Sequence, residues 1–215
     1  MGKPSCMKIN RNFYIRKTCR LCNSSKLLRV LPLRPSPLCD AYLKKPKEQQ
    51  TYPLNLNLCQ VCNFVQIDSV VDPKIIYKDY IYLTTSSQNL KPHFKKYAHQ
   101  VCKNIGLKNP NFVVDIGSND GTLLRCFAKM GSKVLGIEPS IRTARAASQS
   151  GIPTLPYFFD ARVAKKIVAR HGTPDLITVN NLFANIDNLQ EFSKALLSLM
   201  EKNQFWSSNL LGFRT

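Results

Sequence analysis

The sequence contains no apolar run approaching the ~20 residues that a helix needs to span a bilayer, so no membrane partner is expected. Its N-terminal stretch, MGKPSCMKINRNFYIRK, is charged but lacks the apolar segment of a secretory signal, which predicts a cytoplasmic location. In that compartment, eight cysteines are better explained as thiols or metal ligands than as disulfides. The chain of 215 residues is long enough for one or two domains with a sizeable core.

Acidic residues are scarce. Thirteen Asp and Glu stand against 31 Lys and Arg, which gives a formal net charge of +18. The imbalance is concentrated in residues 1–108, which hold 19 basic and 5 acidic residues, whereas residues 109–215 hold 12 and 8. An anionic partner, either nucleic acid or a phosphate-bearing substrate, would explain this excess. A lysine-rich solvated surface is the alternative explanation.

The segment most typical of a nucleotide-binding unit is Phe112–Ser140, FVVDIGSNDGTLLRCFAKMGSKVLGIEPS. This segment lacks the G-x-G-x-x-G motif of dinucleotide sites. The segment nevertheless predicts a β-α-β unit, because apolar strands flank a glycine turn and a helical pattern. We expect a strand over Phe112–Ile116, a turn between Gly117 and Gly121, a helix over Thr122–Met130 and a strand over Lys133–Ile137, followed by Glu138 and Pro139.

Carboxylates flank the predicted glycine turn at Asp115 and Asp120. They would repel a pyrophosphate docked on a helix N-terminus, but they favour a ligand that carries an ammonium and a sulfonium. S-adenosylmethionine (SAM) is such a ligand. Glu138 lies about 20 positions beyond the glycines, where an acidic residue holds a ribose in related units. The alternative is a doubly wound fold whose crevice binds nothing.

Two C-x-x-C pairs indicate a metal site: Cys19 with Cys22, and Cys59 with Cys62. This spacing is typical of a four-thiolate zinc site, which is closed and therefore structural. A left-handed residue is needed soon after the second cysteine of each pair. Asn23 and Asn63 occupy those positions, and asparagine tolerates that conformation well. Unrelated reduced cysteines are the alternative.

Helical and strand patterns alternate from residue 112 to residue 200. The pattern predicts an α/β fold, a Rossmann-like, doubly wound parallel sheet, preceded by a small β-rich zinc-binding lobe. Ligands bind at the carboxyl ends of such strands, where Gly117, Glu138, Phe159 and Asn180 are expected. Besides the first unit, we expect helices over Leu90–Ile105, Ile141–Ser150, Asp160–Arg170 and Leu189–Met200, a strand over Pro174–Asn180, and a strand or loop over Thr154–Phe159.

The segment Tyr77–Ser87, YKDYIYLTTSS, is rich in tyrosine and hydroxyl residues. This composition suits a loop that lines a polar ligand pocket. On composition alone, an aromatic loop that fills space between domains is the better interpretation.

Together these segments make the chain similar to the bacterial sugar C-methyltransferases that act on nucleotide-linked ketosugars. That family joins a zinc lobe to a class I, SAM-binding methyltransferase domain and a further C-terminal domain. The resemblance extends from about Cys19 to about Leu199, and it rests on the order and spacing of the motifs. These motifs are CRLC, CQVC, PLCDAY at 37–42, YIYLTTSS, DIGSNDGTLL, GIEPS and NNLFANIDNL.

The resemblance implies roles for matching positions and two cofactors, SAM and Zn²⁺. Glu138 would bind the ribose, Phe159 and Asn180 would lie near the adenine, and Tyr80 or Tyr82 would contact the sugar. The implied SAM-binding residues are Asp115, Gly117, Ser118, Asn119, Gly121, Glu138, Pro139, Phe159 and Asn180, and the implied zinc ligands are Cys19, Cys22, Cys59 and Cys62. From the residues along the chain we expect a loose basic tail (1–18), the zinc lobe (19–72), a tyrosine loop with a linking helix (73–108), a partial methyltransferase domain (109–203) and an atypical C-terminus (204–215).

The chain departs from the family pattern at two places. Asn185 stands where the family has a histidine, and asparagine cannot act as a base near neutral pH. Family members continue into a domain with a catalytic Glu-His pair, whereas this sequence ends at Thr215 and its last residues, QFWSSNLLGFRT, look unrelated. These departures predict a truncated member of the family, and Asn185, Tyr80 and Tyr82 are its remaining catalytic candidates.

Three functional hypotheses follow. The first is SAM-dependent C-methylation of a nucleotide-linked ketosugar through an enolate, or an inactive truncated form of that enzyme. The second is an RNA methyltransferase whose zinc lobe and basic surface hold RNA; nucleic acid is the weaker partner hypothesis, because no stacking module is evident. The third is a non-catalytic remnant that binds SAM and zinc.

Overall fold

The computed structural model describes residues 12–40, 42–77, 80, 82–87 and 89–200, and the backbone of 205–209. The chain divides into two compact units, Met1–Tyr80 and Ile81–Thr215, each of which is described by itself. Within the described ranges, every helix is too short or too polar to serve as a membrane span.

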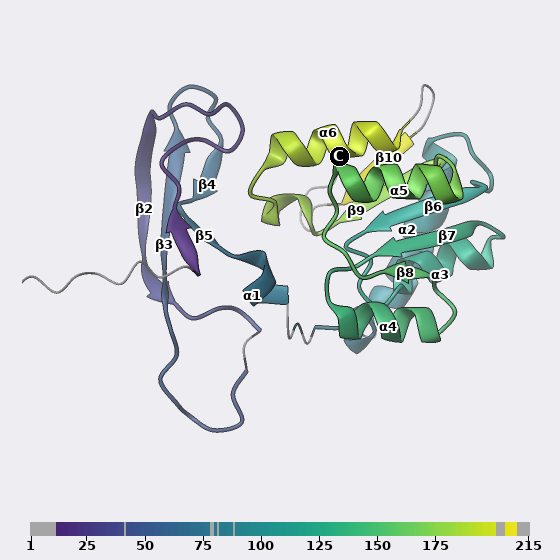
Figure 1. Cartoon of the computed structure of the whole chain (residues 1–215), viewed down its shortest axis with the longest axis horizontal. Coiled ribbons are helices and arrows are strands. Elements are labelled where there is room, and N and C mark those ends of the chain that lie inside the picture. The colour runs from purple at the N-terminus through teal and green to yellow at the C-terminus, as the bar shows by residue number, and fades with distance from the viewer. Residues whose placement is uncertain are drawn as a thin grey trace, which may run out of the picture. The chain divides into compact units, whose positions relative to one another are not determined.

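The first unit is built from two small antiparallel sheets (Figure 1). One sheet has the order β2-β3-β4 and the other pairs β1 with β5. The elements are β1 (Phe13–Ile15), β2 (Leu27–Ser36), β3 (Tyr52–Cys59), β4 (Val65–Ile67), β5 (Ser69–Val71) and the short helix α1 (Pro73–Tyr77). The buried hydrophobic side chains of its described part are Cys19, Tyr52, Cys59 and Val70. Apolar packing alone therefore gives this unit little stability.

The prediction of a loose tail over residues 1–18 is wrong for Phe13–Ile15, which forms β1. This strand pairs with β5, more than 50 residues along the chain, and the Phe13 ring packs edge-on against Tyr52 at 5.3 Å between centroids. Local patterns do not reveal a three-residue strand whose partner is so distant. Residues 1–11 lie outside the described residues.

The second unit contains a five-stranded parallel sheet with the order β10-β9-β6-β7-β8. The order of the strands reverses at β6, because β7 and β8 follow on one side of it and β9 and β10 on the other, which creates the switch point where doubly wound sheets bind ligands. The strands are β6 (Phe112–Ile116), β7 (Lys133–Ile137), β8 (Thr154–Leu155), β9 (Leu176–Asn180) and β10 (Phe205–Asn209). The helices are η1 (Thr84–Ser86), α2 (Leu90–Asn104), α3 (Thr122–Lys129), α4 (Ile141–Gln149), α5 (Ala161–His171), η2 (Phe183–Asn185) and α6 (Leu189–Leu199).

The predicted α/β fold is confirmed, with two differences at the strands. The strand or loop expected over Thr154–Phe159 is a strand only over Thr154–Leu155, because Pro156 has no N–H to continue the pairing. The residues expected to be atypical include β10, which pairs in parallel with β9 from Phe205 to Asn209. In its sequence, FWSSN, only Phe205 and Trp206 are strand formers, and the five residues show no alternation of apolar and polar side chains.

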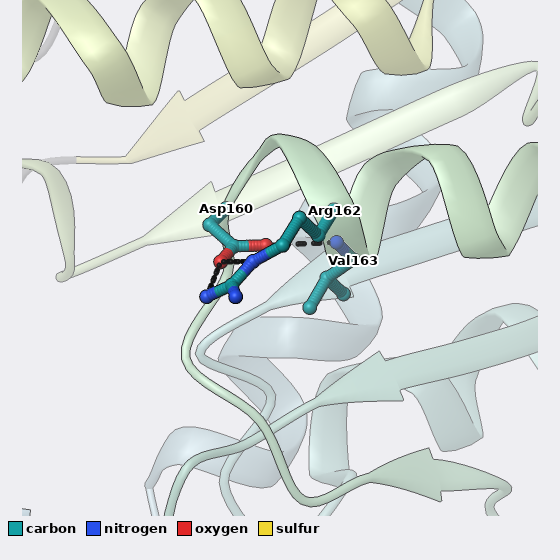
Figure 2. A network of polar contacts seen from close by, with 3 residues as sticks. All are labelled: Asp160, Arg162 and Val163. Carbon is teal, nitrogen blue, oxygen red and sulfur yellow. Dashed lines mark hydrogen bonds and ion pairs between the residues drawn. The ribbon is translucent and has the colours of Figure 1, made fainter.

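Helices cover both faces of the sheet (Figure 1). Residues of α5 and α6 pack with β6, β7 and β9 in one hydrophobic core, and residues of α2 and α3 form a second core. Asp160 caps α5: its carboxylate accepts a hydrogen bond from Val163 N at 2.8 Å and pairs with Arg162 (Figure 2). These contacts fix the scaffold that holds the carboxyl ends of the strands.

Candidate metal and cofactor sites

The two C-x-x-C turns bring four sulfurs together in the first unit. The Sγ atoms of Cys19, Cys22, Cys59 and Cys62 all lie within 4.8 Å of one another. Cys19 Sγ lies 3.6 Å from Cys62 Sγ, and Cys22 Sγ lies 3.5 Å from Cys59 Sγ. A tetrahedral site with Zn–S bonds of about 2.3 Å places its sulfurs about 3.8 Å apart, so this cluster fits zinc closely.

The two turns are matched in their backbone geometry. Asn23 N donates to Cys19 O at 3.0 Å, and Asn63 N donates to Cys59 O at 2.9 Å. Asn23 has φ 59° and Asn63 has φ 61°, which confirms the predicted left-handed residues. The amide of Gln66 ties the first turn to β4, because it accepts from Arg20 N and donates to Thr18 O.

The pKa values of Cys59 and Cys62 differ strongly within the cluster. The backbone N–H groups of Cys62 and Val61 lower the pKa of the Cys59 thiol to about 6, although burial opposes this effect. The Phe64 N–H would lower the pKa of Cys62, but burial and the three neighbouring cysteines raise it to about 12. The Cys59 thiolate therefore forms readily, whereas a bound cation would be needed to favour the Cys62 thiolate.

The second site lies at the carboxyl ends of β6, β7 and β9. We call it the cofactor cradle and define it as the turn 117–121 together with Glu138 and Asn180. The register of the parallel strands places Ile116 beside Ile137, so the glycine turn after β6 lies beside Glu138 after β7. Gly117 N and Ser118 N both donate to Ile137 O, at 2.8 and 3.1 Å, which locks the turn to β7.

Two glycines of the cradle cannot be replaced without moving the backbone or a neighbour. Gly117 has φ 78°, and a Cβ there would lie 3.2 Å from Leu182. Gly121 has φ 75°, and a Cβ there would lie 2.8 Å from Ile152. The turn therefore needs glycine both for its left-handed conformation and for its close packing.

Glu138 is 4% exposed and accepts two backbone hydrogen bonds, one at each oxygen. Asn119 N donates to Oε2 at 3.1 Å, and Ser140 N donates to Oε1 at 2.8 Å. The carboxylate is thus held in one orientation and keeps lone pairs for further donors, which suits the hydroxyls of a ribose. Pro139 links it to Ser140, the N-cap of α4.

Unsatisfied polar groups support a polar ligand in the cradle. Both side-chain polar atoms of Asn180 are buried and have no hydrogen-bond partner among the described residues, and the same holds for Ser118 Oγ. Buried polar groups without partners are costly, so a polar ligand that bonds to them would be favoured. Phe159 is half-buried and packs edge-on against Phe192 at 5.6 Å between centroids.

Asp115, which the sequence suggested would face SAM, is buried beneath the glycine turn. It is 4% exposed, and its Oδ1 accepts a 2.6 Å hydrogen bond from the Thr178 hydroxyl. Burial raises the pKa of its carboxyl to about 7; the Thr178 bond opposes this rise and the charge of Glu138 adds to it. Near neutral pH, Asp115 is therefore a mixture of the charged and neutral forms.

We expect the raised pKa of Asp115 to make the second unit less stable as pH rises. An unfolded aspartate titrates near 3.9. The folded state therefore holds the proton more tightly, and stability falls from about pH 4 to about pH 7. Asp115→Asn keeps the acceptor for Thr178 but cannot titrate. Between pH 5 and pH 8, the Tm of the natural protein should fall by about 5 °C more than that of the variant. Parallel Tm profiles in zinc-saturated buffer would contradict the raised pKa.

Asp120 binds protein groups rather than facing a ligand. Its Oδ1 accepts from the N–H and hydroxyl of Thr122, at 3.1 and 2.6 Å, and its Oδ2 accepts from Thr85 N at 2.8 Å. The Asp120 carboxylate, which the sequence suggested would attract SAM, therefore bonds to the first turn of α3 and to the loop before α2.

Asn119 joins the same loop to the cradle from the other side. Its Nδ2 donates to Tyr82 O at 3.0 Å and its Oδ1 accepts from Thr84 N at 3.1 Å, while its own N–H donates to Glu138. One residue thus connects the loop 82–86, the glycine turn and the acidic residue after β7. Spacing in the sequence gives no sign of this connection.

Asn119→Asp should therefore loosen the loop. The variant tolerates the φ of 50° at this position, but it places a carboxylate oxygen against the Tyr82 carbonyl. We expect exchange of the Thr84 and Thr85 amides with solvent to become about tenfold faster, which corresponds to the loss of roughly one hydrogen bond. Asn181→Asp is the matched control, because Asn181 also has a positive φ, of 54°. Equal exchange rates in the two variants would show that Asn119 does not hold the loop.

The three catalytic candidates lie in different surroundings. Tyr80 belongs to the first unit, where its ring packs against Tyr77 at 5.3 Å between centroids. Tyr82 belongs to the second unit and is 40% exposed. Asn185 lies in η2 on the surface, and its Nδ2 donates to Asn181 O at 3.3 Å. Their roles remain predictions.

Comparison with known proteins agrees with both sites. Residues 19–77 match the family described as "Putative zinc binding domain", and residues 91–205 match "Methyltransferase domain". The chain is similar to the C-methyltransferase NovU of Streptomyces niveus, with 28% identity over 185 residues. That match covers 85% of this chain and 44% of NovU, so the chain spans less than half the length of this relative.

The solved structures to which this chain is similar include two proteins with low sequence identity to it. The PH0226 protein of Pyrococcus horikoshii OT3 is 16% identical, with a TM-score of 0.48 over 59% of this chain and 57% of that one. Magnesium protoporphyrin IX methyltransferase of Synechocystis PCC 6803, solved with bound SAM, is 16% identical, with a TM-score of 0.41 over 60% and 71% of the two chains.

The two cofactors predicted from the sequence, zinc and SAM, agree with the matched families. The zinc ligands are the four cysteines that the first unit clusters, and the methyltransferase match includes every element of the cradle. Because that match covers more than half of the sequence, the chain belongs to the methyltransferase domain family.

Proposed function

We propose that this chain takes part in SAM-dependent C-methylation of a nucleotide-linked ketosugar. The observation that carries the proposal is the similarity to a C-methyltransferase over 85% of the chain, which includes both the zinc-binding and the methyltransferase match. The sugar comes from the resemblance of the sequence motifs, and the SAM assignment is supported by the fit of the cradle.

When bound, SAM supplies an electrophilic methyl group. Glu138 would hold its ribose hydroxyls, the turn 117–121 would lie against its methionine end, and the Asn180 amide would bond to polar atoms of the adenosine. The preoriented carboxylate of Glu138 limits the positions that the cofactor can take, which aligns the methyl group for an in-line attack.

C-methylation beside a ketone also needs a base and a hydrogen-bond donor for the enolate oxygen. Of the two tyrosine candidates, we favour Tyr82 as the donor, because its carbonyl is bonded to Asn119 of the cradle. Asn185 can donate a hydrogen bond but cannot remove the proton. Among the described residues, the cradle would thus supply cofactor binding and a candidate donor, and no base is assigned.

Transfer of a labelled methyl group from SAM to a nucleotide-linked ketosugar tests the proposal. Labelled product from the zinc-loaded full chain would support it, and Tyr82→Phe should then lower kcat by about tenfold or more. Tyr157→Phe is the control, because Tyr157 is similarly exposed, at 45%, and contacts Lys166 instead of the cradle. SAM binding without methyl transfer to any ketosugar nucleotide would leave the non-catalytic hypothesis in place.

A further inference from the structure

A short loop before α2 is attached to the methyltransferase unit by two neighbouring side chains of the glycine turn. Thr84 N donates to Asn119 Oδ1 at 3.1 Å. Thr85 N donates to Asp120 Oδ2 at 2.8 Å. The carbonyl of Tyr82 accepts a third hydrogen bond, from Asn119 Nδ2 at 3.0 Å. These three bonds join the loop to the cradle.

Packing contributes little to the position of this loop, residues 82–86. None of its residues belongs to either hydrophobic core of the described unit, and Tyr82, Thr85 and Ser86 are exposed. The N–H and hydroxyl of Ser86 bond to Leu83 O, within the loop itself. A segment with few buried apolar contacts and solvent-exposed hydrogen bonds opens locally at low cost in free energy. The closed position of the loop therefore depends mainly on its bonds to the glycine turn.

Asn119 connects the loop to the carboxylate that would hold the cofactor. Its own N–H donates to Glu138 Oε2 at 3.1 Å. Its φ of 50° lies in the left-handed region, which asparagine adopts only at some cost, and the two side-chain bonds to the loop stabilise that conformation. If the loop opened, the backbone at Asn119 could relax and its N–H would move away from Glu138. The loop and the carboxylate thus depend on the same conformation of one residue.

Asp120 is a second anchor of the loop, and it does not face the ligand. It is 7% exposed, and its Oδ1 accepts from the N–H and hydroxyl of Thr122 at the start of α3. Only Oδ2 is directed to the loop, where it accepts from Thr85 N. A substitution that changes Oδ2 alone should therefore alter the stability of the closed loop without removing a contact to the cofactor.

We propose that Asn119 is a positioning residue that couples cofactor binding to closure of the loop 82–86. SAM held by Glu138 fixes Asn119 and hence the loop, and the closed loop in turn tightens the binding of SAM. Coupling of this kind is reciprocal, so the factor by which SAM slows loop opening equals the factor by which an open loop weakens SAM binding. The inference rests on the SAM assignment of the proposed function. If Tyr82 is also the enolate donor, the loop that carries it is fixed by the cofactor, and the acceptor sugar binds most tightly after SAM.

Hydrogen exchange of the loop amides, measured by NMR on the zinc-loaded full chain with and without saturating SAM, tests the coupling. In the natural protein, SAM should slow exchange of the Thr84 and Thr85 amides about tenfold, which corresponds to roughly one hydrogen bond. Asn119→Gly keeps the left-handed backbone and the N–H that donates to Glu138, but it removes both side-chain bonds to the loop. In this variant SAM should change the two exchange rates less than twofold, and the Kd of SAM should rise by no more than about tenfold.

Asp120→Asn should give a different pattern. If its oxygen stays with Thr122, its NH₂ group faces the N–H of Thr85, and the loop loses one bond. Exchange of the loop amides should become about tenfold faster both with and without SAM, while the slowing by SAM persists because Asn119 is intact. Asp175→Asn is the matched control, because Asp175 Oδ2 accepts backbone N–H groups at the opposite end of β6, including that of Phe112 at 3.0 Å. It should alter neither the exchange rates nor the effect of SAM.

Three results would overturn the inference. Equal exchange of the loop amides with and without bound SAM in the natural protein would do so and would leave the SAM assignment intact. A tenfold slowing that persists in Asn119→Gly would show that SAM holds the loop by another route. Equally faster exchange in Asp175→Asn would show that the rates report general unfolding. Folded protein that binds no SAM would contradict the SAM assignment itself, and the coupling with it.

Discussion

Cys59→Ser is expected to abolish zinc binding and to unfold the first unit. That unit buries few hydrophobic side chains in its described part, and two of those four are the zinc ligands Cys19 and Cys59. Structural zinc sites contribute about 10–16 kcal/mol of apparent binding free energy, which is also folding free energy where no site exists in the unfolded chain. The zinc-binding free energy lost in the variant would therefore exceed the free energy of unfolding of a unit of this size.

Zinc content per chain and hydrogen exchange of the β2–β4 amides measure this effect. The natural protein should hold one zinc per chain and protect these amides, whereas Cys59→Ser should do neither. Amides of β6 in the second unit serve as an internal reference. Cys39→Ser is the matched control, because Cys39 is exposed and lies outside the sulfur cluster. Protected β2–β4 amides in zinc-free protein would show that the lobe folds without its metal.

Glu138→Gln is expected to weaken SAM binding about 100-fold. Both oxygens of Glu138 accept backbone N–H groups, from Asn119 and Ser140. A glutamine offers one oxygen, so its NH₂ group must face one of these donors. The variant also loses the charge to which a ribose hydroxyl would donate. Hydrogen bonds to a charged group contribute about 1.5–3 kcal/mol each, and the loss of one such bond and the distortion of a second account for this factor.

Glu191→Gln is the control for this substitution. Glu191 is exposed in the first turn of α6, so the same chemical change occurs on the surface of the same unit. Its SAM affinity should equal that of the natural protein. If Glu138→Gln bound SAM equally well, the acidic residue after β7 would not contact the cofactor.

The sequence predicted the secondary structure of the second unit closely, because its signals are local. Strands over Phe112–Ile116 and Lys133–Ile137 are confirmed as predicted, and the helix expected over Leu90–Ile105 ends one residue earlier, at Asn104. Continuous apolar runs mark buried parallel strands, and amphipathic periods bounded by caps or glycines mark the helices.

The zinc site was also predictable, because cysteine spacing and the residue that follows each pair are both written in the sequence. Asn23 and Asn63 adopt the predicted left-handed conformation, and the four sulfurs cluster. By contrast, Phe13–Ile15 and Phe205–Asn209 form strands with distant segments, and strands this short give too few residues for a local pattern.

The sequence was least informative about which polar groups bond to each other. Asp120 was expected to face the cofactor, yet its oxygens hold Thr122 and the loop at Thr85. Asn119 was expected to bind SAM, and its side chain also holds the loop at Tyr82. Hydrogen bonds between residues 35 or more positions apart depend on the tertiary arrangement, which a single sequence does not reveal.

Calorimetric titration of the zinc-loaded full chain with SAM tests the central claim, that the turn 117–121, Glu138 and Asn180 form a SAM site. Saturable binding of one SAM per chain, weakened about 100-fold by Glu138→Gln and unchanged by Glu191→Gln, is the predicted result. Folded, zinc-containing protein that shows no saturable binding of SAM would contradict it.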